Sequence, residues 1–180
     1  MTEQLKKNLS DSKALRWSVL ALVAFTMLCG YFLTDVMSPL KPMLEKELLW
    51  DSLDYGIFTS AYGWFNVFLL MLIFGGIILD KMGVRFTALL SGGVMLIGAV
   101  IKWYAVAEGF KGSGLEAWFT NNLNYIPGFD ELGISPFYQG MPASAKLAAV
   151  GFMIFGCGVE MAGITVSRGI VKWFKGREIA

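Results

Sequence analysis

The sequence contains no histidine and only two cysteines, Cys29 and Cys157. Without an imidazole, histidine general bases, histidine metal sites and histidine proton relays are all excluded. Both cysteines lie inside apolar runs, and two cysteines build neither a disulfide framework nor a zinc site of the usual spacing. Any ionic chemistry in this chain must therefore use carboxylates, lysine, arginine or hydroxyl groups.

Charge is also scarce. Charged residues make up 16% of the 180 residues, against about 25% in a soluble domain. The net charge of +1 leaves no basic face for phosphates, so nucleic acid is not expected as a partner. Hydrophobic residues make up 56% and gather in runs long enough to cross a bilayer. We expect an all-α membrane protein in a lipid bilayer. No metal-ligand cluster or nucleophile–base pair stands out, so neither an enzyme nor a cofactor is expected.

The apolar runs predict four transmembrane helices behind a polar N-terminal arm of residues 1–16; they cover residues 17–37, 55–79, 86–106 and 147–170. The first run is longer than a signal-peptide core and lacks an Ala-x-Ala-like cleavage site, so it is interpreted as a retained helix. A helical extension plus a loop is expected before the second helix. Residues 107–146 form an outer loop too polar to span. Its aromatic residues either pack on the bundle or rest at the interface, or the loop is a variable decoration.

Basic residues predict the orientation. With the N-terminus in the cytoplasm, nine lysines and arginines fall on inner segments and four on outer segments, which follows the positive-inside bias. Both ends of the chain are then cytoplasmic. The lack of a targeting signal and of a glycosylation site in the outer segments is compatible with a bacterial inner membrane.

The turn between the second and third helices carries the most specific pattern, with Gly76, Asp80, Lys81, Gly83 and Arg85. Gly76 is expected to permit close helix contact, and Gly83 suits a tight turn with positive φ. Asp80 ends a helix, where an anion opposes the dipole, so we expect it to have a partner. Lys81 and Arg85 would face cytoplasmic head groups.

This segment resembles the signature loop of the major facilitator superfamily, Gly-x-x-x-Asp-(Arg/Lys)-x-Gly-x-Arg-(Arg/Lys), except that Phe86 replaces the last basic residue. Four further segments resemble the branch that contains the lysosomal dipeptide carrier: Tyr31–Asp35, Ala61–Val67, Phe155–Glu160 and Lys172–Glu178. The outer loop does not match that branch.

The resemblance implies a carrier of twelve helices in two six-helix halves, working by alternating access around a central site. This chain would supply the first four helices of the first half and be incomplete at its C-terminus. Its partners would be the remaining helices, a small organic solute such as a dipeptide or other zwitterion, and protons in the case of symport rather than uniport. The alternative is a stand-alone four-helix assembly or channel-like subunit.

Glu160 is the leading site residue because it lies near the middle of the fourth helix, where a charge costs about 2.5–3.5 kcal/mol. The resemblance implies that it holds a substrate ammonium group. From the residues alone, it is equally a proton-coupling carboxylate or a structural acid. Asp35 lies near the outer end of the first helix, where a carboxylate reaches water, so from the residues alone it is equally an interfacial acid. The resemblance to the same branch makes it a further candidate, with Tyr31 one turn before it on the same helix face. Asn66 and Trp64 are candidates as well, and they line a cavity or serve as packing.

Arg168 follows Glu160 by two turns, about 12 Å along the helix, so a direct ion pair between them is not expected. We expect Arg168 to reach the cytoplasmic surface, with a contact at a cytoplasmic gate as the alternative. Lys102, near the outer end of the third helix, is interpreted in the same way.

Overall fold

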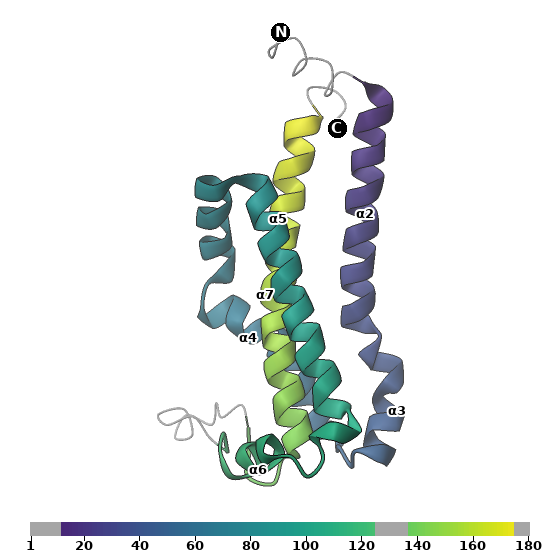
Figure 1. Cartoon of the computed structure of the whole chain (residues 1–180), viewed down its shortest axis with the longest axis vertical. Coiled ribbons are helices and arrows are strands. Elements are labelled where there is room, and N and C mark those ends of the chain that lie inside the picture. The colour runs from purple at the N-terminus through teal and green to yellow at the C-terminus, as the bar shows by residue number, and fades with distance from the viewer. Residues whose placement is uncertain (1–11, 125–136, 175–180) are drawn as a thin grey trace.

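The computed structural model describes residues 12–124 and 137–174, and the secondary structure in these ranges is entirely helical. The elements are α2 (Lys13–Asp35), α3 (Met37–Glu47), α4 (Ser52–Phe68), α5 (Met71–Val106), the 3₁₀ helix η1 (Glu108–Phe110), α6 (Gly114–Asn121) and α7 (Ala143–Trp173) (Figure 1). Three described stretches are long and apolar enough to cross a membrane: Lys13–Glu47, Met71–Val106 and Ala143–Val171. The prediction of an all-helical membrane protein is confirmed at this level.

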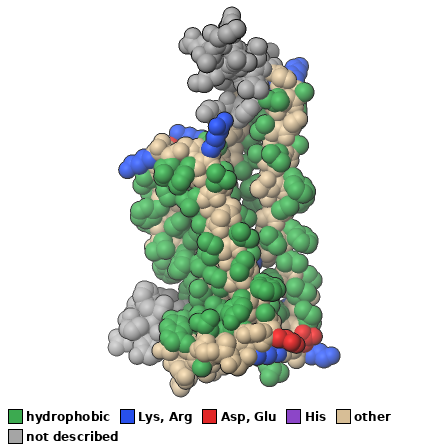
Figure 2. Space-filling view, viewed as in Figure 1, with side chains coloured by type: hydrophobic (Ala, Val, Ile, Leu, Met, Phe, Trp, Pro, Cys, Tyr) green, Lys and Arg blue, Asp and Glu red, His purple; other side chains and the backbone are tan. Residues whose placement is uncertain are grey.

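Hydrophobic side chains cover the middle of the bundle, and charged side chains gather towards its two ends (Figure 2). Many large apolar residues are exposed on this belt, among them Trp17, Leu22, Phe25 and Leu28 of α2. Apolar exposure on this scale is costly in water but suits a surface in contact with lipid.

Helix α7 lies at the centre and packs against α4, α5 and α2. It crosses α5 in close backbone contact at two glycines. A Cβ on Gly98 would lie 2.5 Å from the Phe155 nitrogen, and one on Gly151 would lie 2.9 Å from the Gly98 oxygen. Because lipid provides no hydrophobic drive between helices, such close backbone approach is how they associate. The contact expected at Gly76 is wrong: Gly76 faces open space, and its neighbour Gly75 meets Met161 of α7.

Helix α2 corresponds to the predicted helix 17–37 but begins four residues earlier, at Lys13, within the predicted N-terminal arm. Helix α2 ends at Asp35, and α3 then provides the expected helical extension. Pro39 lies in the first turn of α3, where a missing N–H costs nothing. Within α2 only Gly30 is buried, so this helix is the least enclosed part of the bundle.

The predicted single helix 55–79 is wrong in its middle. Helix α4 ends at Phe68, Leu70 adopts a left-handed conformation (φ 48°), and a new helix begins at Met71. The contact of Gly75 with α7 follows one turn later, so the break changes the direction of the chain and lets the new helix pack on α7.

The tight turn predicted at Gly83 is confirmed. Gly83 has φ 81° and ψ 167°, a conformation that glycine adopts without penalty. There α5 reverses direction, so that its two parts run antiparallel (Figure 1). The second part ends at Val106, as predicted for the third helix.

The segment 107–146 is more than a loop, since it holds η1, α6 and the first turn of α7. Phe110, Phe119 and Phe137 are buried in the core cluster, so the described part of the segment packs on the end of the bundle. Lys146, 1% exposed, donates hydrogen bonds to the Phe119 oxygen (3.0 Å) and to Asn124 Oδ1 (2.6 Å). Residues 125–136 lie outside the described ranges.

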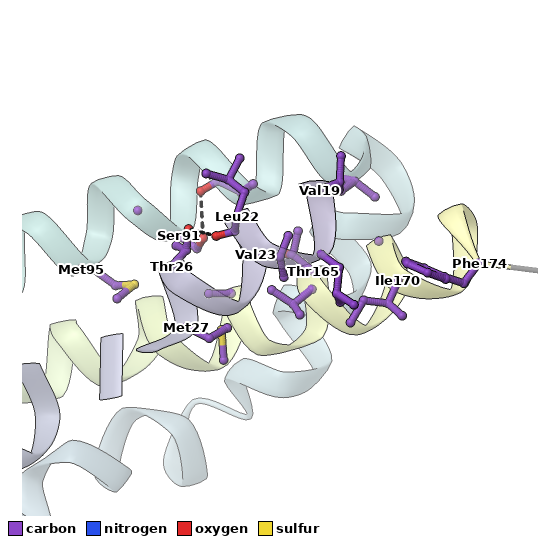
Figure 3. Close-up of a pocket in the computed structure, with 17 residues that line it drawn as sticks. Val19, Leu22, Val23, Thr26, Met27, Ser91, Met95, Thr165, Ile170 and Phe174 are labelled. Carbon is purple, nitrogen blue, oxygen red and sulfur yellow. Dashed lines mark hydrogen bonds between the residues drawn. The ribbon is translucent and has the colours of Figure 1, made fainter. Parts of the chain in front are cut away.

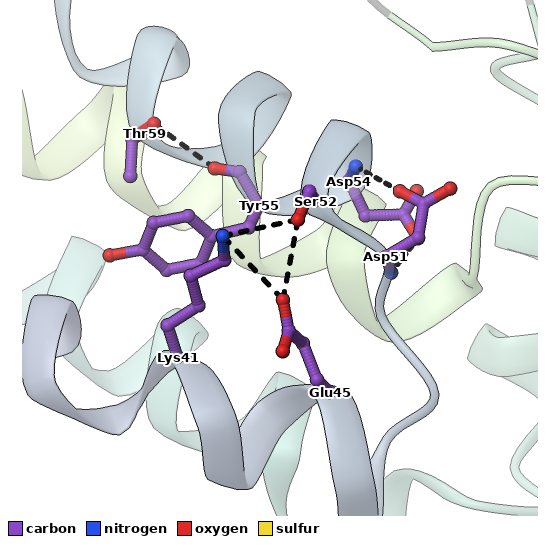
Figure 4. A network of polar contacts seen from close by, with 7 residues as sticks. All are labelled: Lys41, Glu45, Asp51, Ser52, Asp54, Tyr55 and Thr59. Carbon is purple, nitrogen blue, oxygen red and sulfur yellow. Dashed lines mark hydrogen bonds and ion pairs between the residues drawn. The ribbon is translucent and has the colours of Figure 1, made fainter.

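A polar network joins the start of α4 to its surroundings at the same end of the bundle. Asp51 and Asp54 form a reciprocal capping box at the α4 N-terminus, which satisfies two backbone donors. Lys41 and Glu45 of α3 pair at 3.5 Å, and both contact Ser52 (Figure 4). This network fixes α3 and α4 relative to each other.

Candidate functional site

Glu160 lies within α7, well inside the longest apolar stretch of the helix, and its side chain is half-buried. The Tyr62 hydroxyl of α4 donates a hydrogen bond to Glu160 Oε1 at 3.3 Å. The ring of Tyr62 also packs against Phe152, with centroids 5.4 Å apart. The carboxylate therefore faces the α4–α7 interface, and among the described residues the Tyr62 phenol is its side-chain hydrogen-bond partner.

Tyr31 and Asp35 of α2 approach the same place. Both interact electrostatically with Tyr62, as Glu160 does. Their side chains are exposed in this bundle. Helices α2 and α7 thus bring ionisable side chains near Tyr62 of α4, which groups three of the five predicted substrate-site residues.

Asn66 lies one turn after Tyr62 and donates to its backbone oxygen at 3.2 Å. Its Oδ1 is buried and has no hydrogen-bond partner among the described residues, which is unusual for an amide oxygen. A Cβ on Gly156 would collide with the Tyr62 oxygen and approach Asn66 Nδ2 to 3.2 Å. The glycine is what lets α4 lie so close to α7 here, and it places Asn66 in the interface.

Trp64 does not join this group. It lies two residues from Tyr62, on another side of α4, and its ring packs edge-on against Phe68 with centroids 6.5 Å apart. For Trp64 the structure therefore favours the packing interpretation over the cavity one.

Lys102 is the residue that sequence reasoning misplaced. We expected it to reach the membrane surface, but it is 9% exposed and points into the bundle. Its ammonium group lies 4.3 Å from the Phe155 ring and 4.4 Å from the Phe152 ring. It also donates to the Leu33 oxygen at 3.4 Å. Leu33 lies in the last turn of α2, where carbonyl groups lack helical partners.

The turn at Gly83 carries an ion pair at the end of the bundle away from α6. Arg168 Nη2 of α7 lies 2.7 Å from Asp80 Oδ1 of α5, with 61% and 58% of the two side chains exposed. Asp80 thus has the expected partner, and Arg168 makes an interhelical contact. The pair borders a cavity of about 330 Å³ together with Gly83. Lys81 and Arg85 are exposed at this end of the bundle.

A second cavity, of about 260 Å³, lies between α2, the second part of α5 and α7 (Figure 3). Its walls are almost wholly apolar, with Met27, Met95 and Ile170 among them. The hydroxyl of Thr165 donates to the Met161 oxygen in its own helix, and Ser91 does likewise to Ala88. This cavity offers no free polar group to a solute and contains none of the predicted substrate-site residues.

Outside the membrane-spanning segments, Tyr138 stands out. Its hydroxyl donates to Asp54 Oδ1 at 2.7 Å. Burial, the hydrogen bond to Asp54 and the charges of Asp54 and Asp51 together raise the pKa of Tyr138 to about 12. Asp54 itself is 2% exposed, so this bond satisfies a carboxylate at the edge of the core.

Within the described ranges, no three carboxylate or thiol side chains come close enough to hold a metal ion. Comparison with known proteins finds no match among family models, curated sequences or solved structures.

Proposed function

We propose that this chain forms part of a major facilitator superfamily carrier that moves a small organic solute by alternating access, with Glu160 in its substrate site. One observation carries the proposal. Glu160 lies within the apolar span of α7 and accepts a hydrogen bond from Tyr62, and Asp35 and Tyr31 of α2 interact electrostatically with the same tyrosine. An ionisable group at such depth is costly and marks a transport path by default. Clustering on three helices is typical of a solute site.

The turn at Gly83 supports the family assignment. It carries the residues that resemble the signature loop, and its Asp80 binds Arg168 of the helix that also carries Glu160. A movement of α7 during the transport cycle would therefore displace both Glu160 in the solute site and Arg168 in this ion pair. We propose that the pair holds the cytoplasmic side in one of the two access states.

For the solute, a primary ammonium group fits best. Glu160 supplies an anion in surroundings of low polarity, where a charge-assisted hydrogen bond is strong. A dipeptide or another zwitterion satisfies this requirement. Proton coupling through Glu160 is the competing role, since a carboxylate there can pick up and release a proton.

The test is Glu160→Gln in the intact protein, purified and reconstituted in proteoliposomes. A lost ammonium contact lowers dipeptide affinity by about ten-fold or more, whereas a lost proton site abolishes the pH dependence of uptake. Tyr62→Phe, which removes only the hydroxyl, should have a smaller effect on both. Glu116→Gln, in α6 at the bundle end, is the control. Unchanged affinity together with unchanged pH dependence in Glu160→Gln removes both functional roles and leaves a structural acid.

The native mass separates this carrier from a stand-alone four-helix assembly. A band well above the 19.8 kDa of this chain, detected in native membranes, supports a carrier with further helices. A band at that mass, together with self-association, supports the assembly.

A further inference from the structure

We propose that Lys102 binds the carboxylate end of the same solute, so that the site recognises a zwitterion between Lys102 and Glu160. This inference rests on the proposed function and extends it to a residue outside the predicted site. It commits the substrate class to short zwitterions, such as amino acids or dipeptides, and excludes simple amines.

The first argument is the state of the lysine itself. Its side chain is 9% exposed, and no carboxylate of the described residues lies within ion-pair distance of it. Its contacts are the faces of Phe152 and Phe155 and one carbonyl, that of Leu33, at 3.4 Å. Buried charges are normally paired, because one carbonyl and two rings replace only part of a cation's hydration. An anion is the missing partner.

The second argument is that Lys102 and Glu160 share their neighbours. Phe152, which lies under the ammonium group of Lys102, also packs against the ring of Tyr62. Tyr62 in turn donates to Glu160. A cation and an anion thus flank one aromatic pair, Phe152 and Tyr62, at the interface of α4, α5 and α7.

The third argument is the spacing. Phe152 and Phe155 precede Glu160 by eight and five residues, which is about 12 and 7.5 Å along α7. The ammonium group lies over both rings, so the two charges are offset by about 7–12 Å along the axis of α7. A zwitterion of one or two residues spans about 3.5–7 Å, and a charge-assisted hydrogen bond adds about 2.8 Å at each end. The separation matches such a molecule.

Access depends on α2. The Leu33 oxygen occupies the ammonium group in this arrangement, but the bond is long and α2 is the least enclosed helix, with only Gly30 buried. An outward displacement of α2 frees the lysine, and a solute carboxylate is a stronger acceptor than the carbonyl it replaces. If Lys102 instead only caps the end of α2, its loss weakens the bundle and leaves solute selectivity unchanged.

The experiment measures binding by the intact protein, purified in detergent. The probes are L-alanyl-L-alanine and L-alanyl-L-alanine amide, which keeps the ammonium group and lacks the carboxylate. Affinity is taken as the concentration that gives half of the maximal thermal stabilisation. The variants are Lys102→Met and Lys102→Arg. Lys146→Met is the matched control, since Lys146 is also buried but is bonded to Phe119 and Asn124.

We expect wild type to bind the dipeptide about 10- to 100-fold more tightly than its amide. Lys102→Met should bind both within about two-fold, because only the carboxylate contact is lost. Lys102→Arg should keep part of the preference for the dipeptide over its amide, and Lys146→Met should keep all of it. Lys102→Arg and Lys146→Met are both expected to lower the melting temperature. An undiminished preference in Lys102→Met overturns the inference alone. Wild type that binds neither probe overturns the substrate class of the proposed function, and the Lys102 inference with it.

Discussion

The crossing of α5 and α7 provides the sharpest test of the fold. A Cβ built on Gly98 lies 2.5 Å from the Phe155 nitrogen, 2.6 Å from the Gly151 oxygen and 2.7 Å from the Phe155 Cα. All three are backbone atoms, so no side chain can rotate away to make room. Gly98→Ala must push the two helices apart along the whole crossing.

Gly93 provides the matched control. It lies in the same part of α5, and a Cβ there has no atom within 4 Å. Both substitutions change helix propensity alike, by up to about 1 kcal/mol in favour of alanine. The difference between the two variants therefore isolates the steric term, which for an overpacked contact is about 1–3 kcal/mol.

The assay is thermal unfolding of the two purified variants in the same detergent, followed by tryptophan fluorescence. For a chain of this size, 1 kcal/mol shifts the melting temperature by about 2–4 °C. Gly98→Ala should therefore melt about 2–12 °C below Gly93→Ala, and Gly93→Ala at or above wild type. Equal melting temperatures for the two variants would refute the glycine crossing of α5 and α7.

Three further results are expected. Tyr138→Phe should lower the free energy of unfolding by about 1 kcal/mol, because the half-exposed ring loses its bond to Asp54. Since the pKa of Tyr138 is raised from 10 to about 12, this deficit should hold up to about pH 10 and vanish as the pH passes about 12. A deficit that persists beyond that pH contradicts the prediction. A double-mutant cycle on Asp80 and Arg168 should give a coupling of only about 0.2–1 kcal/mol for so exposed a pair, and a larger stability coupling would contradict the reading of a weak, breakable contact. Leu70→Gly should raise the melting temperature slightly, because it relieves about 1–2 kcal/mol of left-handed strain against about 0.5–1 kcal/mol of added chain entropy; a lower melting temperature speaks against that strain.

The elements that could be predicted from the sequence are those set by local chemistry. The turn at Gly83 is fixed by a residue that tolerates positive φ, and the end of α5 at Val106 by the change from apolar to polar residues. The break at Leu70 had no such signal, because leucine favours a helix. The chain bends there because it packs onto α7, a contact that the local sequence does not encode. The helix α6 was missed for a related reason, since its eight residues are held by packing rather than by a long apolar run.

The site divides along the same line. Depth in an apolar run identified Glu160, because that depth is a property of the sequence. Lys102 lies near the end of its run, so hydropathy assigned it to the surface, yet two phenylalanine rings of another helix and one carbonyl of a third hold it inside. Tyr62, the residue that connects the candidates, carries no charge and gave no signal in the membrane. Its role depends on which residue of α7 it meets.

The position of α7 explains why the bundle can link these features. One continuous helix carries Lys146 at the end covered by α6, Glu160 within the span and Arg168 opposite Asp80. Its glycines hold it against α4 and α5 by backbone contact, which leaves little freedom to bend. By contrast, α2 touches the bundle through few buried residues. In the proposed access cycle, α2 is therefore the helix that separates most easily from the rest, and its displacement would carry Asp35 and Tyr31 to or from the Glu160 site.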